Sequence, residues 1–141
     1  NDKLLAYSYI LTHEGYPCVF WHDYFNYNLA LENTPNGIAA LVSAHEKYAG
    51  GATHVLYVDD GLYIMQRTGF GEESGLIYVL NNRGDSWNGK LVTTNWPNAA
   101  FQPVAWWSKT DRARPINQVT DRDGRAQFYA PPRGYAVYAI P

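Results

Sequence analysis

Carboxylates are the side chains in this sequence that could carry general acid–base chemistry. The 141 residues contain thirteen Asp and Glu, with adjacent pairs at Asp59-Asp60 and Glu72-Glu73. Neighbouring side chains on a strand face opposite ways, so an adjacent pair seldom converges on one substrate atom. Most of the other carboxylates fall in expected turns or helix ends, where they are solvated. We therefore predict no catalytic residue in this chain.

Metal-ligand patterns are equally weak. Cys and His do not occur at zinc-binding spacing. The segment Asp121-x-Asp123-Gly124 resembles the start of a calcium loop but lacks the later ligands of an EF-hand. We interpret this segment as a hairpin turn and predict no metal site. Cys18 is the only cysteine, which excludes an intrachain disulfide, and we expect it to be a small buried apolar residue.

Composition narrows the classes of partner. The formal charge is −2 and the basic residues are scattered, so the sequence lacks the basic stripe of a nucleic-acid-binding protein. Apolar residues make up 46%, which excludes a disordered chain, and no apolar run is long enough for a membrane span. Twelve Tyr and five Trp are typical both of β-rich folds and of proteins that handle sugars.

The residues before Gly50-Gly51 predict a helix, a strand and a second helix. Asp2 can cap the first helix, and Gly15 lies just past its end. The run from Pro17 to Trp21 is apolar throughout, which favours a strand buried on both faces, as in a parallel sheet covered by helices. The second helix is expected to begin near Pro35-Asn36 and to end at the two glycines.

The residues after Gly51 predict an antiparallel β-sandwich. The expected strands are separated by turn residues, such as Asp59-Asp60-Gly61. These strands are Thr53 to Val58, Leu62 to Thr68, Leu76 to Leu80, Lys90 to Thr94, Gln102 to Trp107, Ile116 to Val119, Arg125 to Tyr129 and Tyr135 to Ile140. Several short strands at this spacing are typical of a sandwich. The sequence thus predicts two domains, residues 1–50 and residues 51–141.

Three motifs resemble one enzyme family. The run Tyr9-Ile10-Leu11-Thr12-His13-Glu14-Gly15-Tyr16-Pro17-Cys18-Val19-Phe20-Trp21 resembles the last helix–strand step of the α-amylase barrel, which leads into its eighth strand. Tyr48 to His54 resembles the junction that follows in secreted bacterial α-amylases, and Ala130 to Tyr138 resembles the closing strand of their sandwich. The implied fold is an α+β fragment: the helix–strand–helix end of a (β/α)8 barrel, then an antiparallel Greek-key-like β-sandwich.

The resemblance implies an extracellular, retaining glycoside hydrolase that cleaves internal α-1,4-glucosidic bonds of starch and maltooligosaccharides. Retaining enzymes place two carboxylates about 5–5.5 Å apart, and in this family both lie on barrel strands upstream of the present residues. The chain alone is therefore expected to be inactive. The resemblance also implies calcium in the parent enzyme. Secreted relatives have His and Asp in succession near the junction, but His54 here precedes Val55, which has no side-chain oxygen.

The resemblance places one segment beside the glucan cleft, because barrel active sites lie at the C-terminal ends of the strands. Its candidates for substrate contact are Trp21, His22, Asp23, Tyr24 and Tyr27. Aromatic faces pack on the apolar C–H face of a pyranose, while carboxylates and imidazoles hydrogen-bond its hydroxyls. Alternatively, Trp21 and Phe25 belong to the core of the barrel rim, and Asp23 fixes a neighbouring loop.

Tryptophans of the second part form another candidate surface. If Trp106-Trp107 lies in a strand, one ring enters the core and the other faces outward. The outward ring could hold glucan together with Trp87 and Trp96, which lie in turn-rich loops. The alternative is packing against the barrel or under a loop.

Two other functions stay open. One is a non-catalytic carbohydrate-binding module that acts through exposed Trp and Tyr. The other is a purely structural fragment. A single doubly buried strand with two helices leaves apolar faces uncovered, so a missing barrel, a partner chain or an altered packing must cover them. Such a fragment would associate through its open barrel edge with a copy of itself or with the missing N-terminal part.

Overall fold

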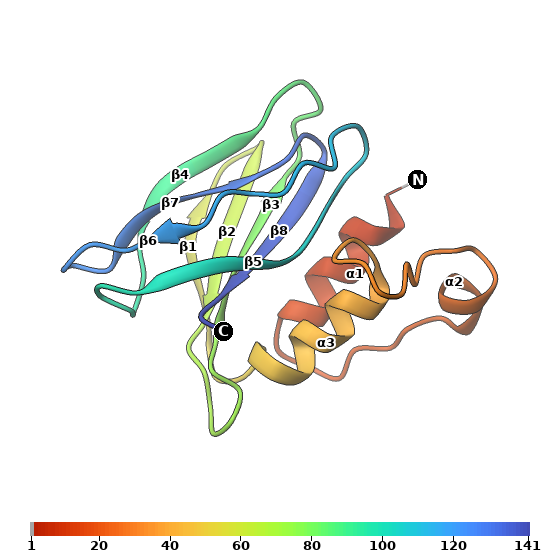
Figure 1. Ribbon diagram of the computed structural model, residues 1–141, viewed down its shortest axis with the longest axis horizontal. Coiled ribbons are helices and arrows are strands. Elements are labelled where there is room, and N and C mark those ends of the chain that lie inside the picture. The colour runs from red at the N-terminus through yellow and green to blue at the C-terminus, as the bar shows by residue number, and fades with distance from the viewer. Residues whose placement is uncertain (1) are drawn as a thin grey trace.

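The computed structural model describes residues 2–141, in which a six-stranded antiparallel sheet lies between a helical layer and a two-stranded sheet (Figure 1). The strands are β1 (Thr53–Val58), β2 (Leu62–Arg67), β3 (Leu76–Asn81), β4 (Asn88–Thr93), β5 (Ala100–Ser108), β6 (Gln118–Val119), β7 (Arg125–Ala130) and β8 (Gly134–Ala139). The helices are α1 (Lys3–Thr12), α2 (Trp21–Phe25) and α3 (Ile38–Tyr48). Each of the eight predicted strands is present near its expected position.

The last strand lies in the middle of the large sheet. Its strand order is β1-β2-β3-β8-β5-β6, while β4 and β7 pair with each other. The turn between β1 and β2 is the predicted hairpin. Asp59 Oδ1 accepts hydrogen bonds from the backbone N–H groups of Gly61, at 2.7 Å, and Leu62, at 2.8 Å. This Asp therefore serves as a turn residue rather than as part of a reactive pair.

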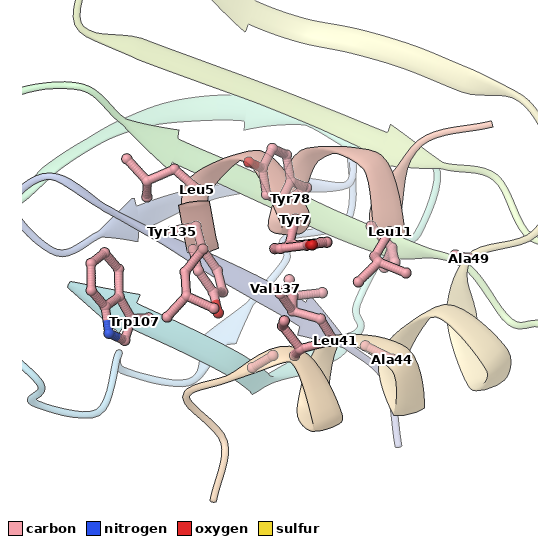
Figure 2. Close-up of a cluster of buried hydrophobic side chains, with 14 of the residues drawn as sticks. Leu5, Tyr7, Leu11, Leu41, Ala44, Ala49, Tyr78, Trp107, Tyr135 and Val137 are labelled. Carbon is pink, nitrogen blue, oxygen red and sulfur yellow. The ribbon is translucent and has the colours of Figure 1, made fainter. Parts of the chain in front are cut away.

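One face of the large sheet packs against the helices (Figure 2). Alternation along β3 directs Leu76 and Tyr78 to this face. The buried residues of this helical-side core are Leu4, Leu5, Tyr7, Leu11, Ile38, Leu41, Ala44, Ala49, Met65, Leu76, Tyr78, Ala105, Trp107, Tyr135 and Val137. Residues from both predicted parts of the chain therefore share one core. Their division into domains at residue 50 stays a prediction.

The other face of the large sheet packs against β4 and β7. Ile77 and Val79 of β3 point to this side, where Phe128 of β7 fills the space between the sheets. The Phe128 ring meets Phe101 edge-on at a centroid distance of 5.4 Å and Tyr138 at 5.1 Å. The central strands β3 and β8 are consequently buried on both faces although every pairing is antiparallel.

The predicted strand from Pro17 to Trp21 is wrong. Residues 16–20 form no strand, and α2 begins at Trp21. A strand needs neighbours that pair with its backbone N–H and C=O groups, and no described strand lies against this segment in the sheets. The expectation for Cys18 is also wrong, because its side chain is exposed. The segment that carries it is not enclosed between two layers.

The end of α1 is fastened to the sheet by polar side chains. The buried Arg67 on β2 donates from Nη1 to the carbonyl of Thr12, at 2.9 Å, and from Nε to that of Gly51, at 3.0 Å. His13 Nε2 lies 2.8 Å from the hydroxyl of Tyr63, and burial lowers the pKa of His13. These contacts fix the helical layer at the point where the chain leaves α1 for residues 16–20.

Candidate functional site

The exposed face of α2 carries the first group of candidate residues. Trp21 and Phe25 are one turn apart and therefore share a face of the helix. Their ring centroids are 5.4 Å apart, and 59% and 62% of their surfaces are exposed. The His22 ring lies edge-on to Trp21, with centroids 5.0 Å apart, and Tyr27 follows at 6.1 Å from His22. Four aromatic side chains thus lie together at the surface.

An apolar hollow of about 370 Å³ adjoins this face. It is lined by Val19, Trp21, Tyr24, Phe25 and Val42. The Tyr24 hydroxyl donates a 3.1 Å hydrogen bond to Glu32 Oε1, which raises the pKa of Tyr24. Flat rings beside a shallow apolar hollow suit the apolar face of a sugar ring. The sequence missed Phe25 as an exposed member of this group, although its i, i+4 spacing from Trp21 was the available signal.

Asp23 differs from the other candidates because its carboxylate is not free to bind a ligand. Only 4% of the residue is exposed. Oδ1 accepts from Lys3 Nζ, and Oδ2 accepts from the Tyr7 hydroxyl, each at 2.6 Å. The hydrogen bond from Lys3 and then that from Tyr7 lower the pKa of Asp23. In the structure Asp23 therefore fixes α2 to α1, whereas the alternative interpretation had it fix a neighbouring loop.

Trp106 and Trp107 point to opposite faces of β5, as predicted. Trp107 is buried in the helical-side core, with 7% of its surface exposed, and the Arg112 guanidinium lies 5.1 Å from its ring centroid. Trp106 is half-buried because its face of the sheet packs towards β4 and β7. Its Nε1 donates to the Arg112 carbonyl at 3.4 Å. Neither ring stands free on the surface.

Trp87 and Trp96 lie in different surroundings. Trp87 Nε1 donates to Asp111 Oδ2 at 2.8 Å, beside the same loop that receives the bond from Trp106. Trp96 instead packs edge-on to Phe101, with ring centroids 5.7 Å apart. Since Phe101 and Trp106 lie towards opposite ends of β5, the four tryptophans do not form one surface.

A second hollow, of about 270 Å³, is lined by Trp87, Ile116 and Tyr129. Tyr129 pairs with Gly89 across β4 and β7, and a β-carbon on Gly89 would lie 2.4 Å from Tyr129 Cδ1. The glycine thus leaves room for the ring. Sequence reasoning missed Ile116 and Tyr129 as partners of Trp87, because the three come from separate segments of the chain.

Asp121 is the first residue of the segment that resembles the start of a calcium loop, and its carboxylate binds backbone groups of its own turn. Asp121 Oδ1 accepts from the backbone N–H groups of Asp123, at 2.9 Å, and Arg125, at 3.0 Å, which confirms a turn. The turn is not the predicted hairpin, because the strands before and after it, β6 and β7, pair with β5 and β4 and not with each other. Among residues 2–141, no group of three or more His, Cys, Asp or Glu could hold a metal ion. No helix in this described part is long and apolar enough to cross a membrane.

Comparisons by sequence identify relatives of parts of the chain. Residues 76–139 match the family model described as the α-amylase C-terminal domain. An α-amylase of Geobacillus stearothermophilus is 39% identical over 77 residues, which are 52% of this chain and 14% of that protein. The chain therefore spans only a small share of this curated relative.

Solved structures share the fold. A γ-CGTase from alkalophilic Bacillus clarkii has a TM-score of 0.67 at 14% identity, covering 97% of this chain and 23% of its own. CldA, a cyclomaltodextrin glucanotransferase with a three-domain ABC distribution, has a TM-score of 0.66 at 17% identity, covering 99% and 32%. A GH30 endoxylanase from Clostridium papyrosolvens has a TM-score of 0.52 at 11% identity, covering 72% and 26%. At these identities the likeness is one of fold, which unrelated functions can share.

Proposed function

Because residues 76–139 match the family model of the α-amylase C-terminal domain, we propose that this chain is the C-terminal part of a retaining glycoside hydrolase. The parent would cleave internal α-1,4 bonds of starch and maltooligosaccharides. The observation that carries the proposal is the 39% identity to an α-amylase of which the chain spans 14%. The rest of such a protein has room for the barrel and its catalytic carboxylates.

Within this proposal each part of the chain has its own role. Residues 1–50 supply the end of the barrel, in which residues 16–20 lead from α1 to α2 without forming a strand. Residues 51–141 form the C-terminal sandwich. The exposed apolar side chains of Phe20, Trp21 and Phe25 would face the glucan cleft, the rest of the barrel or a second copy of the chain. We further propose that the parent is extracellular and that its calcium is held by residues other than those described.

The isolated chain should not turn over a blocked maltoheptaoside, even at high enzyme concentration. Asp23, Asp59 and Asp121 serve turns and structural contacts, and a retaining mechanism needs two carboxylates about 5–5.5 Å apart across the scissile bond. The substrate carries a chromophore at its reducing end, and the assay measures release of this chromophore by the purified 16.0 kDa chain. A longer protein that includes this chain is the positive control and should hydrolyse the substrate. Proton NMR of its reaction should detect the α-anomer of the product first, because the proposed mechanism retains configuration.

Turnover that copurifies with the 16.0 kDa chain would contradict the proposal that the catalytic carboxylates lie outside this chain. A longer product that releases the β-anomer first, or cuts only at chain ends, would contradict the proposed reaction. In either case the fold assignment would stand, because it rests on residues 76–139.

A second candidate function is glucan binding on the sandwich. The specific observation in its favour is the hollow lined by Trp87, Ile116 and Tyr129. Two aromatic rings and an exposed Ile give it an apolar lining, while Asp111 and Gln127 offer hydrogen-bond acceptors nearby, as their bonds to Trp87 and Tyr129 show. Such a site would hold substrate without hydrolysing it, which is the action of a carbohydrate-binding module.

Trp87→Ala should weaken retention of the chain in amylose-containing gels about tenfold, equivalent to roughly 1.4 kcal/mol. The substitution removes the largest ring of the hollow, while the rest of the sandwich core is unchanged. Affinity electrophoresis over a range of amylose concentrations measures the dissociation constant. Trp96→Ala is the matched control, because Trp96 lies towards the other end of β5. Equal retention of the Trp87 variant and the unchanged chain would exclude this hollow as a binding site.

A further inference from the structure

The orientation of α2 is not determined by its own ends. The helix has only five residues, and its N-cap residue Phe20 makes no side-chain capping bond. The preceding residues 16–20 form no strand that could aim it. So short a helix is not stable alone. Contacts with the rest of the molecule must therefore fix the direction in which its aromatic side chains point.

Three side chains, which we name the α1–α2 clasp, provide these contacts: Lys3, Tyr7 and Asp23. Lys3 and Tyr7 are one turn apart on α1 and point to the same side. Each lies 2.6 Å from a different oxygen of the Asp23 carboxylate. The Tyr7 hydroxyl also accepts a 3.1 Å hydrogen bond from the backbone N–H of Phe20. The clasp therefore holds both the start and the middle of α2.

The clasp also determines which face of α2 meets solvent. Residues two apart on a helix point about 200° apart, so Asp23 lies opposite both Trp21 and Phe25. Binding of Asp23 to α1 consequently turns these two rings away from the protein, where they are exposed. Lys3 Nζ also lies 5.1 Å from the Tyr27 ring centroid, which places a further exposed aromatic ring beside the same clasp.

We infer that Lys3, Tyr7 and Asp23 are positioning residues that hold Trp21 and Phe25 in the orientation in which they stack on a glucan. This inference rests on the proposed function, in which the α2 face contacts substrate. Tyr7 and Asp23 are buried and do not themselves touch the sugar. They act by keeping the binding-competent orientation of α2 populated before the glucan arrives, which lowers the cost of binding.

Tyr7→Phe is the variant that tests the inference. It removes one hydroxyl from a residue that cannot reach the glucan, and so breaks the bonds to Asp23 and Phe20 N–H without changing any residue of α2. If the competent orientation falls to about a tenth of the population, the dissociation constant for maltoheptaose rises about tenfold. Isothermal titration calorimetry on the full 141-residue chain measures this constant. Tyr9→Phe, on the same helix but outside the clasp, is the matched control.

A second measurement reports orientation directly. In chain labelled with 5-fluorotryptophan, the fluorine NMR line of Trp21 is identified by its loss in Trp21→Phe. Tyr7→Phe should shift or broaden this line and leave the other four tryptophan lines in place, which a general loss of stability would not do. An unchanged Trp21 line in Tyr7→Phe overturns the inference.

The two readouts separate this inference from the proposed function. If Trp21→Ala weakens maltoheptaose binding but Tyr7→Phe does not, the clasp is not a positioning device and the inference is wrong. If Trp21→Ala binds as tightly as the unchanged chain, the glucan contact at α2 is what fails. The Trp21 fluorine line then decides alone whether the clasp orients α2.

Discussion

Phe128→Ala should lower the free energy of unfolding by about 3–5 kcal/mol. Phe128 is fully buried between the two sheets, where its ring meets Phe101 and Tyr138 edge-on. Truncation removes the apolar burial and leaves a cavity that two rigid sheets cannot close. Because β4 and β7 pair only with each other, this core contributes much of the packing that holds them against the large sheet. Urea unfolding followed by circular dichroism measures the loss.

Gln127→Ala is the control for this prediction. Gln127 is the neighbouring residue on β7, but its side chain faces solvent, so the change should stay within about 0.5 kcal/mol. A loss below 1 kcal/mol for Phe128→Ala would mean that β4 and β7 do not pack on the large sheet as described. A second unfolding transition in the variant would instead show that β4 and β7 separate from the large sheet before the rest unfolds. This result would agree with the pairing of β4 and β7 with each other alone.

The strands of this fold could be predicted because turn residues separate them. Asp59 and Asp121 each accept backbone N–H groups within their own turn, so the signal and its cause lie within a few residues. Helix α3 was predictable for a similar reason, since the helical spacing of Ile38 and Leu41 in the sequence matches its buried face. These turns and this helix could be predicted because the residues that cause them lie close together in the sequence.

The rule that linked a continuous apolar run to a parallel strand failed here. The apolar runs of β3 and β8 are antiparallel, yet both strands are buried on two faces, by the helices on one side and by β4 and β7 on the other. An apolar run reports how many faces are covered, not the direction of the neighbours. The apolar run at residues 17–21 forms no strand. A strand needs a neighbouring strand to pair with its backbone, and the described residues place none beside this run.

The candidate sites depend on contacts between distant segments, which no local pattern contains. Asp23 was identified as a polar residue beside aromatics, but its buried role needs Lys3 and Tyr7, twenty and sixteen residues away. Likewise, Trp87 was identified by residue type, but the hollow around it needs Ile116 and Tyr129. The sequence therefore predicted which residue types could bind a sugar, while tertiary packing decided which of them are exposed.

The side chain of Asn81 joins segments of the fold that are far apart in the sequence. It is fully buried at the end of β3. Its Nδ2 donates to the carbonyls of Ser86, Ala130 and Pro131, at 2.9, 3.3 and 3.1 Å, and its Oδ1 accepts from Arg83 N–H at 2.9 Å. One side chain thus ties the start of β4, the end of β7 and the following turn to the large sheet.

Asn81→Asp should lower the free energy of unfolding at pH 7 by about 3 kcal/mol or more, because it leaves an uncompensated buried charge. The shape is kept, but the donor is replaced by a carboxylate that faces three carbonyl oxygens. This environment favours the neutral acid, so the pKa of the new carboxyl is raised in the folded state above the unfolded value of about 3.9. The unfolded chain then loses its proton first as pH rises, so stability falls from about pH 4 towards the raised folded pKa.

Urea unfolding at pH 4 and pH 7 tests whether the free energy of unfolding of Asn81→Asp falls with pH. The control is Asn81→Leu, which removes the same bonds without a charge and should show no such pH dependence relative to the unchanged chain. Equal losses for the two variants at both pH values would mean that the site admits water and that Asn81 does not hold the three segments in a buried contact.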